Sequence, residues 1–188
     1  MKTREITALG LLIAIEILLA IVPNIGMIMI GPVSITIMHI PVIIAALMMG
    51  VKGGLILGLV FGASSWFVAA TRGVTPIDLL FVNPIVAILP RLIFGSFCGL
   101  MSLLLKNKND ILRSGLTAVL GTLVHSVIVL SVIFFLGVLT ETNGVLSIVS
   151  QLWVFIAGIM ASNGILEAVA AGVIVIPVVK IVNKIYVK

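Results

Sequence analysis

The sequence predicts an all-α membrane protein, with six transmembrane helices in a compact bundle and both termini on the cytoplasmic side. The composition, the length of the apolar runs and the placement of basic residues predict this class. Of the 188 residues, 62% are hydrophobic and 9% are charged, whereas soluble domains contain roughly 25% charged residues. Six spans of about 20 residues each would fill roughly 120 positions. We therefore expect residues 1–188 to form a single integral membrane domain.

The apolar runs predict six spans, at residues 5–23, 37–51, 53–70, 85–105, 112–137 and 150–181. The first run resembles a signal peptide, but it lacks a small-residue cleavage site and is interpreted as a helix. The second is too short to cross about 30 Å of hydrocarbon, and Pro41 is expected to mark the start of its regular part. Glycine and proline interrupt residues 24–38. This stretch is expected to fold over the outer face of the bundle, with an ordinary interfacial loop as the alternative.

The basic residues predict the orientation of the chain. If both termini are cytoplasmic, nine of the eleven Lys and Arg residues lie on that side: Lys2, Arg4, Lys52, Lys106, Lys108, Arg113, Lys180, Lys184 and Lys188. Of the other two, Arg72 lies on the opposite side and Arg91 lies within a span. This distribution follows the positive-inside rule. It also accounts for the net charge of +5 without a nucleic-acid partner.

Small residues recur every four positions on three of the expected spans. These ridges are Gly54, Gly58 and Gly62; Gly164, Ala168 and Gly172; and Gly10 with Ala14. Such ridges allow two helix backbones to approach closely inside a membrane. Most are expected to serve internal packing, whereas a ridge that faces lipid would be a docking face for another membrane subunit.

Motifs of soluble enzymes are missing from the sequence. There is no phosphate-binding G-x-x-x-x-G-K-[ST] loop, no H-E-x-x-H and no G-x-S-x-G, so we expect neither ATP hydrolysis nor another enzymatic activity. The single cysteine, Cys98, excludes an internal disulfide and is interpreted as a packing residue. His39 and His125 are far apart in the sequence, and no metal site or cofactor is expected.

Arg91 is the strongest candidate for ligand recognition. Ionisable groups inside a bilayer are costly, and they usually face a cavity or one another. The preceding Pro90 lacks a backbone donor and therefore leaves a nearby carbonyl without its helical partner. The guanidinium can offer a planar fork to a carboxylate. That carboxylate belongs either to a ligand or, in a structural pair, to Glu16 or Glu167.

The other polar candidates each leave two interpretations open. Asn163 and Glu167 are four residues apart and share one helix face, where they would bind a ligand or form an interhelical hydrogen bond. His125 is either a ligand contact or a histidine satisfied within the bundle. Trp66 either lines a pocket or belongs to the outer aromatic belt. His39 and Asn83 are expected near the outer ends of their helices.

Two stretches carry a family resemblance. The first runs from His39-Ile40-Pro41-Val42 through Gly50-Val51-Lys52-Gly53-Gly54, and the second from Phe81-Val82-Asn83-Pro84 to Pro90-Arg91-Leu92-Ile93-Phe94-Gly95. In their order and spacing they resemble the substrate-binding S components of energy-coupling factor (ECF) vitamin transporters, and the resemblance covers nearly the whole chain. It implies capture of one vitamin near the outer face of a prokaryotic cell membrane, beneath the loop after the first helix.

The resemblance also implies partners and a ligand. The first helix would contact a transmembrane T component, coupled to two cytosolic ATPases, through Gly10 and Ala14, although the family usually has alanine at the first position. The His-Ile-Pro-Val and Pro-Arg segments look most like pantothenate carriers. The substrate-binding candidates are Arg91, Asn83, His39, Trp66, His125, Asn163 and Glu167.

Other ligands and other classes of function remain alternatives. A carrier of hydroxymethylpyrimidine or pyridoxine, or of riboflavin, would have the same architecture, although 6% aromatic residues offer little stacking surface for an isoalloxazine ring. A structural or regulatory membrane subunit would bind no ligand and would pair Arg91 with Glu16 or Glu167. A self-contained secondary transporter should contain internal repeats, and we find no convincing repeat between residues 1–94 and 95–188.

Overall fold

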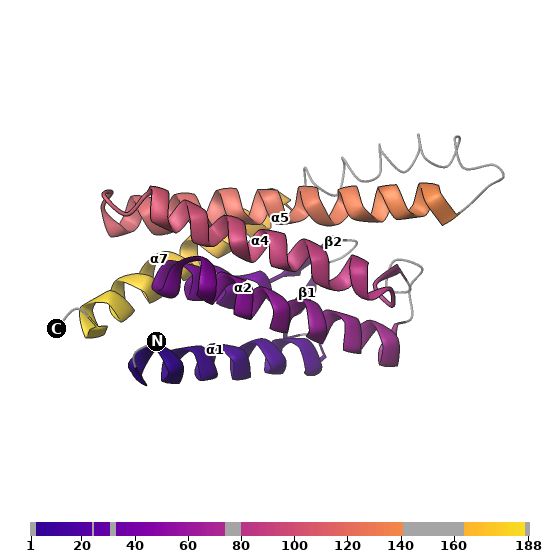
Figure 1. Ribbon diagram of the computed structural model, residues 1–188, viewed down its shortest axis with the longest axis horizontal. Helices are drawn as coiled ribbons and strands as arrows, with labels where there is room; N and C mark the ends of the chain where they lie inside the picture. The colour runs from indigo at the N-terminus through magenta and orange to yellow at the C-terminus, as the bar shows by residue number, and fades with distance from the viewer. Residues whose placement is uncertain (1–2, 24, 31–32, 74–79, 141–163, 187–188) are drawn as a thin grey trace.

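The computed structural model describes residues 3–23, 25–30, 33–73, 80–140 and 164–186, which form a helical bundle with one β hairpin (Figure 1). In chain order the elements are α1 (Thr3–Ile21), β1 (Met27–Ile30), β2 (Val33–Thr36), α2 (His39–Arg72), α4 (Pro84–Leu104), α5 (Asp110–Thr140) and α7 (Ile165–Tyr186). Figure 1 shows α1 along one side of the bundle, beside α2, with α4 and α5 adjacent on the other side.

Four helices in the described part of the chain are long and apolar enough to cross a membrane. They are α2, α4, residues Asp110–Val132 of α5 and residues Ile165–Lys184 of α7. This confirms the helical membrane class. The expected spans 5–23, 85–105 and 112–137 correspond to α1, α4 and α5 within a few residues. The start of the last expected span, at residue 150, lies outside the described residues.

The expected spans 37–51 and 53–70 correspond to the two segments of α2, which consists of two helices joined across a kink. Its helical geometry breaks only at Gly50, which has φ 64° and ψ −148°, a conformation that glycine adopts without a steric penalty. A Cβ on Gly53 would collide with the carbonyl oxygen of Ala45. Residues eight apart meet only if the chain reverses. The two segments of α2 therefore fold back on each other around one glycine.

The interrupted stretch before α2 contains a β hairpin, a form that the sequence analysis did not predict. β1 pairs antiparallel with β2, with Met27 opposite Thr36 and Ile30 opposite Val33. The backbone N–H of Ile37 donates to the carbonyl of Gly26 at 3.0 Å and extends the pairing by one step. Paired strands satisfy many of their own backbone groups, which is why non-helical chain is tolerated beside an apolar bundle.

The glycine ridge of α2 packs directly against the backbone of α4. A Cβ on Gly54 would collide with the carbonyl of Gly95, and a Cβ on Gly58 would collide with the carbonyl of Arg91. One on Gly62 would lie 2.7 Å from the Cα of Ile88. The structure thus confirms the internal packing role for this ridge, and it shows that the ridge fixes the part of α4 that carries Arg91.

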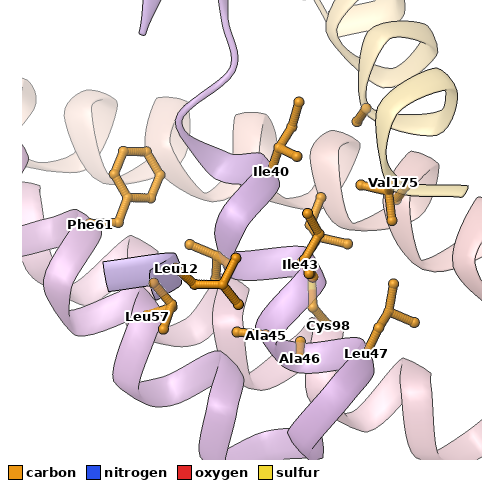
Figure 2. Packing of buried hydrophobic residues seen from close by; sticks show 14 of the residues in the cluster. Leu12, Ile40, Ile43, Ala45, Ala46, Leu47, Leu57, Phe61, Cys98 and Val175 are labelled. Atoms are coloured by element: carbon orange, nitrogen blue, oxygen red, sulfur yellow. The ribbon is translucent and has the colours of Figure 1, made fainter. Parts of the chain in front are cut away.

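The apolar core is centred on the first segment of α2. Ile43 and Ala45 have no exposed surface. Figure 2 shows Leu12 of α1, Cys98 of α4 and Val175 of α7 among the side chains gathered around this segment. Cys98 is a buried free thiol, in agreement with its predicted role as a packing residue.

Most basic residues lie near helix ends that are all at the same end of the bundle. The start of α1, the break in α2, the turn between α4 and α5 and the end of α7 all lie at this end (Figure 1). There, Arg113 Nε donates to the carbonyl of Ser102 at 3.1 Å, and Arg113 Nη2 donates to the carbonyl of Leu47 at 2.8 Å and to Ser102 Oγ at 2.6 Å. Because Leu47 lies in the last turn before Gly50, Arg113 satisfies a carbonyl where the helical hydrogen-bond pattern is interrupted.

Candidate functional site

Arg91 is held in place by the carbonyl that Pro90 leaves free. Pro90 has no N–H, so the carbonyl of Val86, four residues earlier, lacks its helical donor. Arg91 Nη1 donates to this oxygen at 3.0 Å. The free carbonyl expected from the sequence is thus that of Val86, and it is satisfied by the side chain of Arg91, the residue after Pro90. This bond keeps the guanidinium close to α4, where Arg91 is only 6% exposed.

Two phenylalanine rings stabilise the charge of Arg91. The guanidinium carbon lies 4.7 Å from the ring centroid of Phe81 and 5.3 Å from that of Phe61. Both distances are within the range of cation–π attraction, which is stronger for a desolvated cation. Phe61 belongs to α2 and Phe81 to the chain just before α4. The two rings therefore contact Arg91 from different parts of the fold.

Neither carboxylate considered as a structural partner forms an ion pair with Arg91 in the part of the chain described. Glu16 is fully buried, and its two carboxylate oxygens accept no hydrogen bond there. Glu167 Oε1 instead accepts from the backbone N–H of Thr36 at 2.7 Å. Arg91 Nε is buried and has no acceptor among the described residues. The guanidinium therefore retains the capacity to bind an anion.

Two histidines lie next to these aromatic rings. The ring centroid of His125 in α5 lies 4.8 Å from that of Phe94, 5.6 Å from that of Phe61 and 6.1 Å from that of His39, with which it is stacked at an interplanar angle of 20°. His39 was expected near a helix end and is the first residue of α2, where it is completely buried. The reversal at Gly50 brings His39 and Phe61 to the same histidine.

The polar atoms of these histidines are largely without partners in the described structure. Both ring nitrogens of His39 and Nδ1 of His125 are buried and make no hydrogen bond there, although the Thr36 backbone lies close to His39. Buried polar groups are rarely left unsatisfied in native proteins. Together with Arg91 Nε, these nitrogens mark the place where a polar ligand would satisfy several protein groups at once. We call His39, Phe61, Phe81, Arg91, Phe94 and His125 the arginine–histidine cluster.

Trp66 and Asn83 lie outside this cluster. Asn83 is exposed and caps α4, since its Oδ1 accepts from the backbone N–H of Ile85 at 3.0 Å. Trp66 is 38% exposed and donates from Nε1 to the carbonyl of Val82 at 3.1 Å. Both side chains thus make bonds near the start of α4. Asn163 lies outside the described residues, and so its predicted role stays a prediction.

The three phenylalanines of the cluster were not among the residues predicted from the sequence, where Trp66 was the one aromatic side chain considered for the site. Two of them left a signal in their spacing. Phe94 is three residues after Arg91, and Phe61 is three residues after Gly58, so each shares a helix face with a residue already singled out. Three of the eight phenylalanines in the chain lie in this cluster.

The small-residue ridge of α1 faces outward. Gly10 and Ala14 are exposed, and a Cβ on Gly10 would meet nothing within 4 Å. Large apolar side chains next to them are also exposed, among them Ile6 at 58%, Leu11 at 63% and Leu18 at 59%. In contrast to the ridge of α2, this apolar surface is open for lipid or for another protein.

Comparison with known proteins shows the family of the chain. A family model described as the substrate-specific component of ECF transporters matches residues 4–179. The chain is 32% identical over 168 residues to the pantothenic acid transporter PanT of Lactococcus lactis subsp. cremoris (strain MG1363), covering 81% of this chain and 80% of the relative. It is 29% identical over 187 residues to the pantothenate transporter PanT of Leuconostoc mesenteroides subsp. mesenteroides, covering 93% and 89%.

Proposed function

The chain belongs to the family of ECF transporter substrate-specific components, and from that premise we propose that its ligand is pantothenate. Membership makes it a subunit of a membrane transporter rather than an enzyme. The observation that carries the choice of ligand is the state of Arg91. It is buried and held by two aromatic rings, and neither Glu16 nor Glu167 pairs with it in the described structure.

The chemistry of pantothenate fits the arginine–histidine cluster. Its carboxylate would supply the negative charge that the guanidinium lacks, through charge-assisted hydrogen bonds from Nε and the remaining terminal nitrogen. Its amide and hydroxyl groups would bond with the free ring nitrogens of His39 and His125. Riboflavin, pyridoxine and hydroxymethylpyrimidine have no carboxylate, and so they would leave Arg91 as a buried charge without a counter-ion.

We further propose the topology and the partners of the chain. Counting the two segments of α2 separately, six spans cross a prokaryotic cell membrane as one domain, with both termini in the cytoplasm. The gathering of basic helix ends at one end of the bundle supports this orientation (Figure 1). The exposed surface around Gly10 and Ala14 would dock the T component, and two cytosolic ATPases would supply the energy for import.

A binding experiment on the purified chain in detergent tests the ligand and the role of Arg91. Calorimetric titration should show pantothenate binding in the wild type and about 100-fold weaker binding in Arg91→Ala, since hydrogen bonds to charged groups contribute about 1.5–3 kcal/mol each. Pantothenol, which has an alcohol in place of the carboxylate, should bind weakly and with nearly equal affinity to both proteins.

Arg72→Ala is the matched control, because Arg72 also donates to a backbone carbonyl, that of Ile21, but is the last residue of α2 and lies outside the arginine–histidine cluster. Its affinity for pantothenate should equal that of the wild type. Tighter binding of riboflavin, pyridoxine or hydroxymethylpyrimidine would refute pantothenate as the ligand. Unchanged affinity in Arg91→Ala would remove Arg91 from the site, and no binding of any vitamin would refute ligand capture itself.

A further inference from the structure

Glu167 connects two parts of the chain that are far apart in sequence. It lies in the first turn of α7 and is 7% exposed. Its Oε1 accepts a hydrogen bond of 2.7 Å from the backbone N–H of Thr36, the last residue of β2. A carboxylate bound to a backbone donor forms one of the stronger hydrogen bonds in proteins. The role of this bond depends on the direction in which the Thr36 N–H points and on the short connection from Thr36 to His39.

The register of the hairpin explains why Thr36 needs an external acceptor. Ile37 donates to Gly26, so these two residues form a hydrogen-bonded pair. In an antiparallel ladder the neighbouring pair, Met27 and Thr36, does not exchange hydrogen bonds. The N–H of Thr36 therefore points away from β1. Beside an apolar bundle such an edge donor must find a partner, and the structure provides Glu167.

The end of β2 also determines where His39 lies. Only Ile37 and Met38 separate Thr36 from His39, and Ile40 N–H donates back to the carbonyl of Ile37 at 3.1 Å. So short a connection cannot absorb a shift of the strand without moving the first turn of α2. A displacement of Thr36 would therefore move the His39 ring relative to His125, with which it is stacked.

We propose that Glu167 is a positioning residue, which holds the end of β2 through Thr36 and so fixes His39 within the arginine–histidine cluster. This inference rests on the proposed capture of pantothenate and gives Glu167 a role other than direct ligand contact. Because its Oε1 is already bound to Thr36, the carboxylate acts on the ligand site through the backbone of β2.

Two pairs of variants separate this role from its alternatives. Thr36→Pro removes the N–H donor at an edge position where proline is tolerated, whereas Thr36→Val keeps the donor and loses only the hydroxyl bond to the Gly26 carbonyl. Glu167→Ala removes the acceptor, whereas Glu167→Gln keeps an acceptor oxygen. Thr36→Pro and Glu167→Ala should each weaken pantothenate binding about tenfold, the equivalent of one such hydrogen bond.

The double variant Thr36→Pro/Glu167→Ala should bind no more weakly than either single variant, because both remove the same bond. Thr36→Val and Glu167→Gln should bind nearly as the wild type does. Pantothenol should lose affinity to the same degree as pantothenate, since the bond positions His39 and not Arg91. Additive losses would refute the proposal. So would a loss in Glu167→Ala without one in Thr36→Pro, which would make Glu167 a direct ligand contact.

Hydrogen exchange measured without ligand keeps this test independent of the proposed function. In Glu167→Ala, the backbone amides of the hairpin and of the first turn of α2 should exchange about tenfold faster than in the wild type, while those of α4 should be unchanged. Unchanged exchange at the hairpin would refute the positioning role. If the wild type bound no pantothenate but exchange still increased, the positioning role would stand and the assigned ligand would be wrong.

Discussion

Two ridges of small residues in this protein have the same spacing and opposite surroundings. In α2, Gly54 and Gly58 lie so close to α4 that an added Cβ would collide with its backbone. In α1, an added Cβ on Gly10 would meet nothing within 4 Å, and Ala14 is exposed. The spacing alone therefore does not distinguish a packed helix interface from an open one. The neighbouring element decides, and it is known only from the three-dimensional structure.

The closed ridge of α2 and the open ridge of α1 also serve two different tasks. The closed ridge brings the backbone of α2 against the carbonyl of Arg91 and thereby helps to build the arginine–histidine cluster. The open ridge contributes nothing to that cluster in the described structure and leaves an apolar surface on α1 for a partner. Substitutions in the closed ridge should therefore affect folding and ligand binding. Equivalent substitutions in the open ridge should affect assembly alone.

The largest effect is expected from Gly54→Leu. The new side chain would have to occupy the space of the Gly95 backbone, which cannot move without separating α2 from α4. We expect a loss of about 3 kcal/mol or more in stability, at the upper end of overpacking penalties, and little folded protein in size-exclusion chromatography. Gly10→Leu is the matched control and should elute as the wild type does and melt at no lower temperature, since its side chain meets no neighbour at Cβ. Similar behaviour of the two variants would contradict the distinction between the ridges.

The next largest effect concerns assembly. Gly10→Leu and Ala14→Leu should each reduce co-purification with the T component and its ATPases by about 100-fold, because a bulky side chain would prevent close approach of two helix backbones. Pantothenate binding by the isolated chain should be unchanged. Assembly that survives both substitutions would place the docking surface elsewhere, and joint loss of assembly and ligand binding would indicate misfolding.

A smaller effect is expected from Gly58→Ala. A single methyl group at this position would push against the Arg91 carbonyl, and a local shift of α4 would tilt the guanidinium away from its ligand. We expect pantothenate affinity to fall about tenfold, in line with the sensitivity of bound geometry to small displacements. Gly54→Ala is the control, since it presses on Gly95 rather than on Arg91. Gly54→Ala should lower the melting temperature as much as Gly58→Ala does, but it should reduce the affinity for pantothenate less.

The helices could be predicted from the sequence because a bilayer imposes a minimum length of apolar chain. The break within α2 was predicted, since the expected spans 37–51 and 53–70 meet within a few residues of Gly50. A single Gly50 in a left-handed conformation makes it, without the polar loop that normally marks the end of a span. The pairing of β1 with β2 could not be predicted, since glycine and proline interrupt the apolar sequence before α2 as they would in an irregular segment.

The candidate site was predictable only where its contacts are local. Pro90 and Arg91 are adjacent, so the free Val86 carbonyl and the cation beside it follow from the sequence. The approach of His39 to His125 depends on the reversal at Gly50 and on packing between separate helices, which no local pattern encodes. Arg91 pairs with neither Glu16 nor Glu167 in the described structure, and this too could be learned only from the fold.

The smallest effect is expected from Gly10→Ala, which tests the open ridge from the opposite direction. Glycine within a helix costs roughly 0.5–1 kcal/mol relative to alanine, and here the added methyl group meets no neighbour within 4 Å. The isolated chain should therefore become slightly more stable, with a melting temperature a few degrees higher. Alanine is still small enough for close helix contact, so association with the T component should be preserved. Reduced association with unchanged stability would mean that Gly10 is needed for a backbone approach closer than alanine allows. The open ridge would then resemble the closed ridge of α2, with the T component in the place of α4.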